Sequence, residues 1–133
     1  MKIKSNIFVI LTSIFISCSV DDIQPVNEVW TKAQKYYENK EYNNSLVLLH
    51  RIIENKFYDD DFKAKSFFLI SEIYLNEYKE YDISISFLNK ILDNYPNHDL
   101  AKRSLFTKAY INANYIEAFT EAATLYNQFI KIY

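Results

Sequence analysis

The chain has 133 residues, a formal net charge of −2 and no glycine at all. Phosphate-cradling loops, dinucleotide-binding turns and nucleophile elbows all need a close backbone approach that only glycine permits, so these sites are excluded. One cysteine and two histidines exclude a disulfide framework and argue against a metal site. The slightly acidic balance argues against nucleic acid as a partner.

The first residues follow the pattern of a secretory signal. Two lysines precede an apolar run at residues 7–16, which is too short to span a bilayer. Ser17 and Cys18 come next, and a small residue before a lone cysteine at this place resembles the lipobox of bacterial lipoproteins, although Phe15 stands where that family usually has leucine. The resemblance implies a signal peptide over residues 1–17 and lipidation of Cys18. The alternative is a buried cysteine in an ordinary first helix.

Residues 18–25 are expected to form the lipidated cysteine and a tether, because they are polar and end in Pro25. The segment at residues 19–22 is similar to the acidic surface-export signal that follows the cysteine in Bacteroidota lipoproteins. A plain solvated spacer is the other interpretation of this segment, and the sequence does not choose between them.

The rest of the chain, residues 26–133, repeats itself. Residues 66–95 align with residues 104–133 without a gap at a spacing of 38, and a looser copy precedes them. Each copy holds two apolar stripes with helical spacing. In the last copy the second stripe consists of Ala122, Leu125, Tyr126, Phe129, Ile130 and Tyr133. The pattern predicts an all-α domain of three helical hairpins, six helices in all, in units at about 26–58, 61–96 and 99–133.

Polar residues mark the expected ends of these helices. Asn43 and Asp82 are expected to cap the second helices of the first two units. The acidic run at residues 59–61 and His98 are expected to cap the first helices of the later units. Asparagine tolerates the left-handed conformation that glycine usually takes, so the turns inside the units are expected at Asn39, Asn76 and Asn114.

The order of bulky, small and aromatic residues in the second unit resembles that of tetratricopeptide repeats. It runs Ala64, Phe67, Ile70, Ser71 and Tyr74, then Tyr81, Ser84, Leu88, Ile91 and Pro96. The period of 38 departs from the usual 34. Residues 91–96 and 106–133 look like small lipoproteins of the BamD type, which belong to the outer-membrane β-barrel assembly machinery. The resemblance implies a right-handed α-solenoid on the bacterial outer membrane, facing the periplasm or the cell surface.

In tetratricopeptide arrays the first helices of the units line a concave face that binds partners. Alignment places eleven residues there, although packing between repeats is the alternative role of each aromatic: Trp30, Gln34, Tyr37, Glu38, Lys65, Phe68, Glu72, Asn76, Phe106, Tyr110 and Asn114. Six of them are the candidate groove residues: Trp30, Gln34, Tyr37, Phe68, Glu72 and Tyr110. Mixed aromatic and polar linings suit an extended peptide or a partner helix.

The expected function is therefore non-catalytic. The chain would be a membrane-anchored protein-interaction scaffold of the cell envelope, an accessory of outer-membrane assembly or secretion, whose partner is an envelope protein or an extended peptide segment. His50 is expected to be solvated and His98 to cap a helix, so neither suggests an enzyme, and no cofactor is implied. The alternative is a glycan-binding surface lipoprotein, because tyrosine and tryptophan stack on sugar rings.

Overall fold

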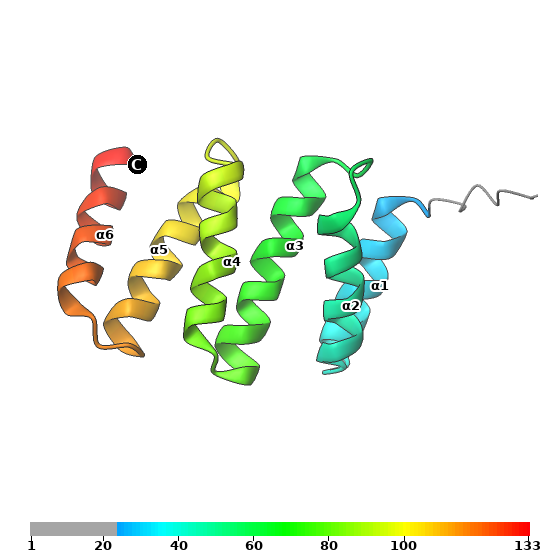
Figure 1. The fold of residues 1–133 in the computed structure, drawn as a ribbon, viewed down its shortest axis with the longest axis horizontal. Coiled ribbons are helices and arrows are strands. Elements are labelled where there is room, and N and C mark those ends of the chain that lie inside the picture. The colour runs from blue at the N-terminus through cyan, green and yellow to red at the C-terminus, as the bar shows by residue number, and fades with distance from the viewer. Residues whose placement is uncertain (1–23) are drawn as a thin grey trace, which may run out of the picture.

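The computed structural model describes residues 24–133, so Cys18, the expected signal peptide and most of the tether lie outside the described residues. The described part is all-α, as predicted, and its six helices pack in adjacent pairs (Figure 1). The helices are α1 (Val26–Glu38), α2 (Tyr42–Glu54), α3 (Asp60–Ile73), α4 (Tyr81–Asn94), α5 (Asp99–Asn114) and α6 (Phe119–Ile132). A π-helical turn, η1 (Tyr74–Tyr78), extends α3.

The helices form two rows. Every helix packs against the next one in the chain, and the backbones of α1 and α3, like those of α3 and α5, also approach closely. Within residues 24–133 the backbones of α2, α4 and α6 stay further apart, and α2 meets α4 through side chains such as His50 and Phe87. When the helices of one row lie closer together than those of the other row, the whole stack bends so that the closely spaced row is on the concave side. The row of α1, α3 and α5 is therefore the inner row, and its free surface is the inner face.

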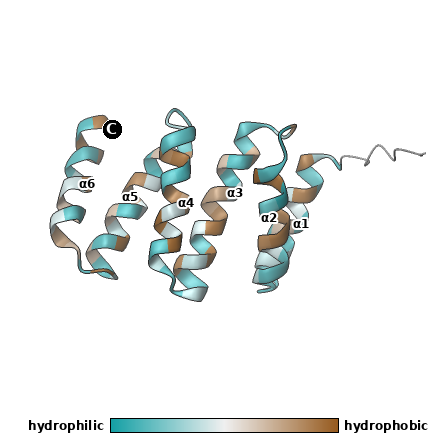
Figure 2. Ribbon diagram, in the orientation of Figure 1, coloured by the Kyte–Doolittle hydropathy of each residue, from teal (hydrophilic) through white to brown (hydrophobic). Residues whose placement is uncertain are grey.

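Small residues bring the two helices of each hairpin together. The hydroxyl of Ser45 on α2 donates to the carbonyl of Ala33 on α1 at 2.9 Å, and the hydroxyl of Ser84 on α4 donates to the carbonyl of Ser71 on α3 at 2.9 Å. Both serines are fully buried, and Ala122 occupies the equivalent place on α6. Larger aliphatic residues fill the rest of the core, so the apolar positions in Figure 2 are spread over every hairpin.

The first helices of the later units are capped as expected. Asp59 precedes α3, and its Oδ1 accepts a hydrogen bond from the amide of Phe62 at 3.1 Å. His98 precedes α5, and its Nδ1 accepts from the amide of Leu100 at 3.0 Å. These two side chains satisfy amides that the first helical turn leaves without partners.

The expected caps of the second helices are wrong. Asn43 and Asp82 lie inside the first turns of α2 and α4, which begin at Tyr42 and Tyr81. Neither helix has a side-chain cap, since Glu41 and Glu80 stand at the cap positions without a capping bond. The reason is that each turn reverses the chain so tightly that the helix resumes two residues after the left-handed residue.

The left-handed residues also differ from the prediction. Positive φ angles occur at Lys40 (62°), Lys79 (58°) and Glu117 (60°), and not at Asn39, Asn76 or Asn114. Asn76 lies within η1 and Asn114 ends α5, because both first helices continue further than expected. The residue after each left-handed one donates its amide back into the preceding helix, from Glu41 to Tyr36, Glu80 to Tyr74 and Ala118 to Asn112.

Candidate functional site

A groove of about 1020 Å³ crosses the inner face. Residues of α1, α3 and α5 line it, together with the loop at residues 97–98 that leads into α5. The lining residues are Trp30, Gln34, Tyr37, Glu38, Asp61, Lys65, Phe68, Leu69, Glu72, Asn97, His98, Asp99, Leu100 and Arg103. The groove therefore spans all three hairpins, which no single unit could achieve.

Five of the six candidate residues lie together in this groove: Trp30, Gln34, Tyr37, Phe68 and Glu72. The sixth, Tyr110, does not line it, and neither do Asn76, Phe106 and Asn114, whereas Glu38 and Lys65 do. The ring of Tyr110 meets that of Tyr115 edge to face at 5.8 Å, near the turn that joins α5 to α6. Tyr110 has the repeat position of Glu72, but in the third unit the groove is formed by residues nearer the start of α5, at Leu100 and Arg103.

The aromatic rings of the groove also belong to the core. Trp30 meets Phe62 edge to face at 6.2 Å, and Tyr37 meets Tyr42 in the same way at 5.9 Å. Both groove rings are half-buried, and Phe68 is buried. These rings are therefore held in place by packing, whereas the side chains of Gln34 and Arg103 are exposed to solvent.

A cluster of three charged or polar side chains lines the groove where α3 and α5 begin. Asp61 on α3 accepts from Lys65 at 2.6 Å and lies 3.1 Å from Nε2 of His98. Because Nδ1 of His98 accepts from an amide, the neutral ring donates to Asp61 through Nε2. The hydrogen bond from Lys65 is the largest cause of a lowered pKa of Asp61, and His98 adds to it. The cluster ties the start of α3 to the start of α5.

Glu72 is a groove carboxylate whose charge is disfavoured by burial and only weakly compensated. Its nearest cation is Arg103, whose Nη2 lies 4.0 Å from Oε1 of Glu72, too far for a hydrogen bond. The guanidinium instead covers the ring of Phe68, 4.6 Å from its centre. Burial raises the pKa of Glu72, and the charge of Arg103 only partly opposes this. Burial and the charges of Glu72 and Glu77 likewise raise the pKa of Tyr37.

Sequence reasoning placed Asp61 and His98 only at helix ends and did not consider Arg103. The repeat itself could have revealed the contact between Asp61 and His98. These residues are almost one repeat period apart, and residues at that separation lie side by side when the units stack. The position of Arg103 over Phe68 had no comparable signal, because it depends on how α5 lies against α3.

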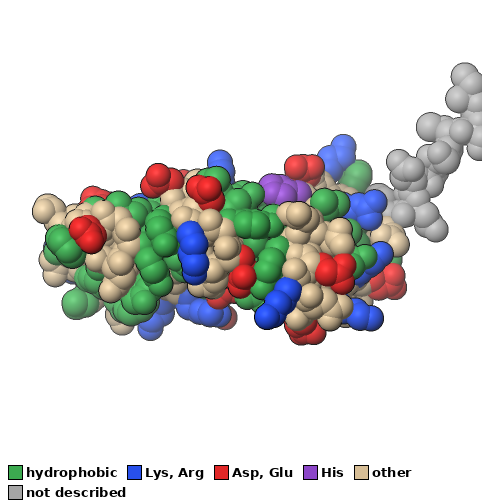
Figure 3. Space-filling model, turned by 90° about the horizontal axis from the view of Figure 1, so that it is seen from below, with side chains coloured by type: hydrophobic (Ala, Val, Ile, Leu, Met, Phe, Trp, Pro, Cys, Tyr) green, Lys and Arg blue, Asp and Glu red, His purple; other side chains and the backbone are tan. Residues whose placement is uncertain are grey.

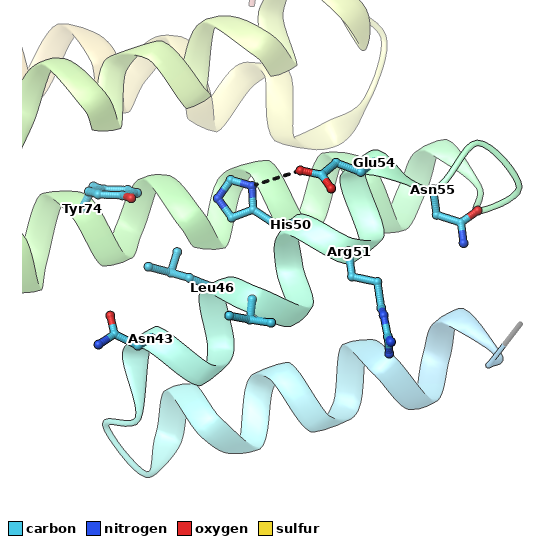
Figure 4. A pocket seen from close by; sticks show the side chains of 8 residues that line it. Asn43, Leu46, His50, Arg51, Glu54, Asn55 and Tyr74 are labelled. Atoms are coloured by element: carbon cyan, nitrogen blue, oxygen red, sulfur yellow. Dashed lines mark ion pairs between the residues drawn. The ribbon is translucent and has the colours of Figure 1, made fainter. Parts of the chain in front are cut away.

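A second hollow, of about 840 Å³, lies beside α2 (Figure 4). His50 lines it and is half-exposed, with Nδ1 3.9 Å from Oε1 of Glu54 and its ring edge-on to Phe87 at 6.0 Å. Leu46 and Tyr74 supply apolar walls (Figure 4). The side chain of His50 thus lies between Glu54 on its own helix and the ring of Phe87 on α4.

Within residues 24–133 there is no group of three or more metal-ligating side chains. None of the described helices combines the length and the hydropathy of a membrane-spanning segment. Comparisons of the chain with models of protein families, with curated proteins and with solved structures gave no match. The residues of the groove are therefore the basis on which a function can be argued.

Proposed function

We propose that this protein is a non-catalytic binding scaffold that holds an extended peptide segment of a partner protein in the groove across α1, α3 and α5. The observation that supports this is the groove itself, which spans three hairpins and combines aromatic walls with exposed polar side chains. A long, shallow site of this kind suits a peptide, which gains affinity from aromatic anchors and orientation from polar contacts.

The charges of the groove favour a peptide with a basic side chain. Four carboxylates line the groove against one lysine and one arginine, and Lys65 is already paired with Asp61. Glu72 is partly desolvated and has no cation within hydrogen-bond distance among the described residues. A lysine or arginine of the peptide could bond to Glu72 directly, beside the rings of Tyr37 and Phe68, and so offset its desolvation.

We further propose that the scaffold works in the bacterial cell envelope, anchored to the outer membrane by lipid on Cys18. The support is the sequence pattern of the first 18 residues and the resemblance of the repeats to tetratricopeptide lipoproteins of the BamD type. Residues 18–25 would then tether the groove to the membrane. An accessory role in outer-membrane assembly or secretion fits such a placement.

Selection of peptides from a random displayed library on the full chain tests the groove. We expect the bound peptides to be enriched in lysine or arginine next to apolar residues. The Glu72→Gln variant should lose the enrichment in basic residues. Glu54→Gln is the matched control, because Glu54 lies on α2, away from the groove. Equal enrichment with Glu72→Gln and the unaltered chain would contradict the assignment.

Fractionation of cells tests the anchor separately. Replacement of Cys18 by alanine removes the only thiol that could carry the lipid, so the variant should leave the membrane fraction. The Ser17→Ala variant keeps a small residue before the cysteine and should stay with the membrane. Retention of Cys18→Ala in the membrane fraction would refute lipidation without affecting the groove.

The aromatic wall also suits a second candidate, a glycan-binding surface lipoprotein. Trp30, Tyr37 and Phe68 line the groove, and such rings can stack on sugars. A glycan array distinguishes the two proposals. A signal that free sugar competes away, and that Tyr37→Ala removes, would favour the glycan over the peptide.

A further inference from the structure

An uncovered apolar stripe runs along α6. Phe119 is 66% exposed and Ile130 is 73% exposed, and Ala123 between them is exposed as well. Tyr126 and Tyr133 complete the stripe, whose members follow one another at spacings of four and three residues and so lie on one side of the helix. Tyr126 is half-buried against Phe106, with the ring centres 5.6 Å apart, so the uncovered members are Phe119, Ala123, Ile130 and Tyr133. Large apolar residues gathered in this way usually mark an interface.

The equivalent residues of the earlier units are covered. Tyr42, Leu46 and Ile53 on α2 have the repeat positions of this stripe, and so do the residues Tyr81, Ile85 and Leu92 on α4. All six are half-buried. Tyr81 stacks on Tyr115 at 4.8 Å, and Leu92 packs in a cluster with Leu105, so the next unit does the covering. The stripe on α6 thus corresponds to the faces of α2 and α4 that the next unit covers.

The outer side of α1, at the other end of the array, is not a suitable surface to cover this stripe. The face of α3 that packs against α2 includes Leu69, Ile70 and Ile73. Thirty-eight residues earlier, α1 carries Thr31, Lys32 and Lys35, and all three are exposed. Figure 3 shows the same contrast, with hydrophobic side chains at the α6 end and charged ones at the α1 end. Stacking of copies head to tail would therefore bury lysines against the apolar stripe.

We propose that α6 pairs with α6 of a second copy of this chain. The five residues of the stripe are spaced as in the seam of a coiled coil, and none of them is charged. Self-pairing of such a stripe brings no like charges together. Contact of the same face on both copies makes a closed two-fold dimer rather than a filament.

This inference does not depend on the proposed function, because the stripe and the groove share no residue. A dimer would also have a consequence for the proposed function. A dimer through α6 leaves both grooves open, so one assembly could hold two segments of the same partner with increased avidity.

Sedimentation equilibrium of the full chain tests the proposal. We expect the unaltered chain to dimerise, and the Phe119→Ser/Ile130→Ser double variant to dimerise about tenfold more weakly, or more weakly still. Val47→Ser is the matched control, because Val47 is also 68% exposed but lies on α2, outside the stripe. Circular dichroism should show the same helix content in all variants, since each altered side chain is mostly in solvent.

Three results would overturn the proposal. The first is an unaltered chain that stays monomeric at its highest soluble concentration. The second is association that the double variant does not weaken, which would assign the contact to another part of the chain. The third is equal weakening by Lys32→Glu on the outer side of α1, which would show head-to-tail stacking instead.

Discussion

At the scale of single residues, the size of a few buried side chains sets how closely the helices of a hairpin approach. Ser45 and Ser84 are fully buried, and each donates a hydrogen bond to a carbonyl of the partner helix. In the third hairpin Ala122 has the same position without a hydroxyl. The shared property is therefore small volume, and the hydrogen bond is an addition.

We expect Ser84→Ala to lower the free energy of unfolding by about 1 kcal/mol, the usual net value of one hydrogen bond. Ser84→Leu should lower it by about 1–3 kcal/mol more, because the added carbons overpack the contact between α3 and α4. Urea unfolding of the three proteins measures both values. A leucine variant as stable as the alanine variant would show that volume does not limit this contact.

Two carboxylates of the groove respond to folding in opposite ways. Burial raises the pKa of Glu72, so the folded state binds this proton more tightly than the unfolded state, and the ionised form destabilises the fold. The bond from Lys65 lowers the pKa of Asp61, so its ionised form stabilises the fold. That stability exists above the unfolded pKa of Asp61 and is lost as the pH falls through its folded pKa.

Thermal unfolding as a function of pH should show this contrast. At neutral pH we expect Glu72→Gln to raise the melting temperature slightly and Asp61→Asn to lower it. Both differences should shrink in acid, where the unaltered carboxylates become protonated. Shifts of the same sign in the two variants would contradict the assigned causes. Because the ionised side chain of Glu72 lowers the stability of the fold, its presence in the groove fits a role in binding.

At the scale of elements, three turns share one device without glycine. Lys40, Lys79 and Glu117 take left-handed conformations, which cost an ordinary residue about 1–2 kcal/mol each. The amide that follows each of them bonds back into the preceding helix and secures the reversal. The turns are thus held by backbone hydrogen bonds at a conformational cost.

Glycine at Lys79 should relieve this cost. We expect Lys79→Gly to raise the free energy of unfolding by about 0.5–1 kcal/mol, because greater freedom of the unfolded chain cancels part of the gain. Asn76→Gly is the control inside η1, where glycine should lower the free energy of unfolding by about 0.5–1 kcal/mol. Chemical unfolding measures both. A loss of stability with Lys79→Gly and a gain with Asn76→Gly would instead indicate that Asn76 is the left-handed residue.

At the scale of the whole molecule, each hairpin packs only on its neighbours. Stability is then a sum of hairpin and interface contributions. Ile70 is fully buried between the first two hairpins, in one cluster with Ala33 and Leu49. Loss of this side chain should weaken one interface and leave the packing of α5 on α6 unchanged.

We expect Ile70→Ala to cost about 2–5 kcal/mol. Hydrogen exchange should accelerate in α1 and α2 more than in α5 and α6. Val47→Ala, at an exposed position on α2, should change stability by less than about 0.5 kcal/mol. Uniform acceleration in all six helices would instead mean that the array unfolds as one cooperative unit.

The sequence by itself determined the all-α fold and the pairing of helices into hairpins. Apolar stripes with helical spacing require helices, and a repeat of 38 residues that holds two stripes requires a hairpin. The same repeat places corresponding residues of the units on the row of α1, α3 and α5. Five of the candidate groove residues therefore lie together. The caps at Asp59 and His98 were predictable because they depend on local backbone geometry.

Only the tertiary structure decided the rest. The left-handed turn positions depend on how far each helix extends before its partner packs, which asparagine preference alone does not reveal. The position of Arg103 over Phe68, the incomplete pairing of Glu72 and the separation of Tyr110 from the groove arise where α5 meets α3. Those contacts join residues of different units, and the distances between units are set by packing rather than by any one unit's sequence.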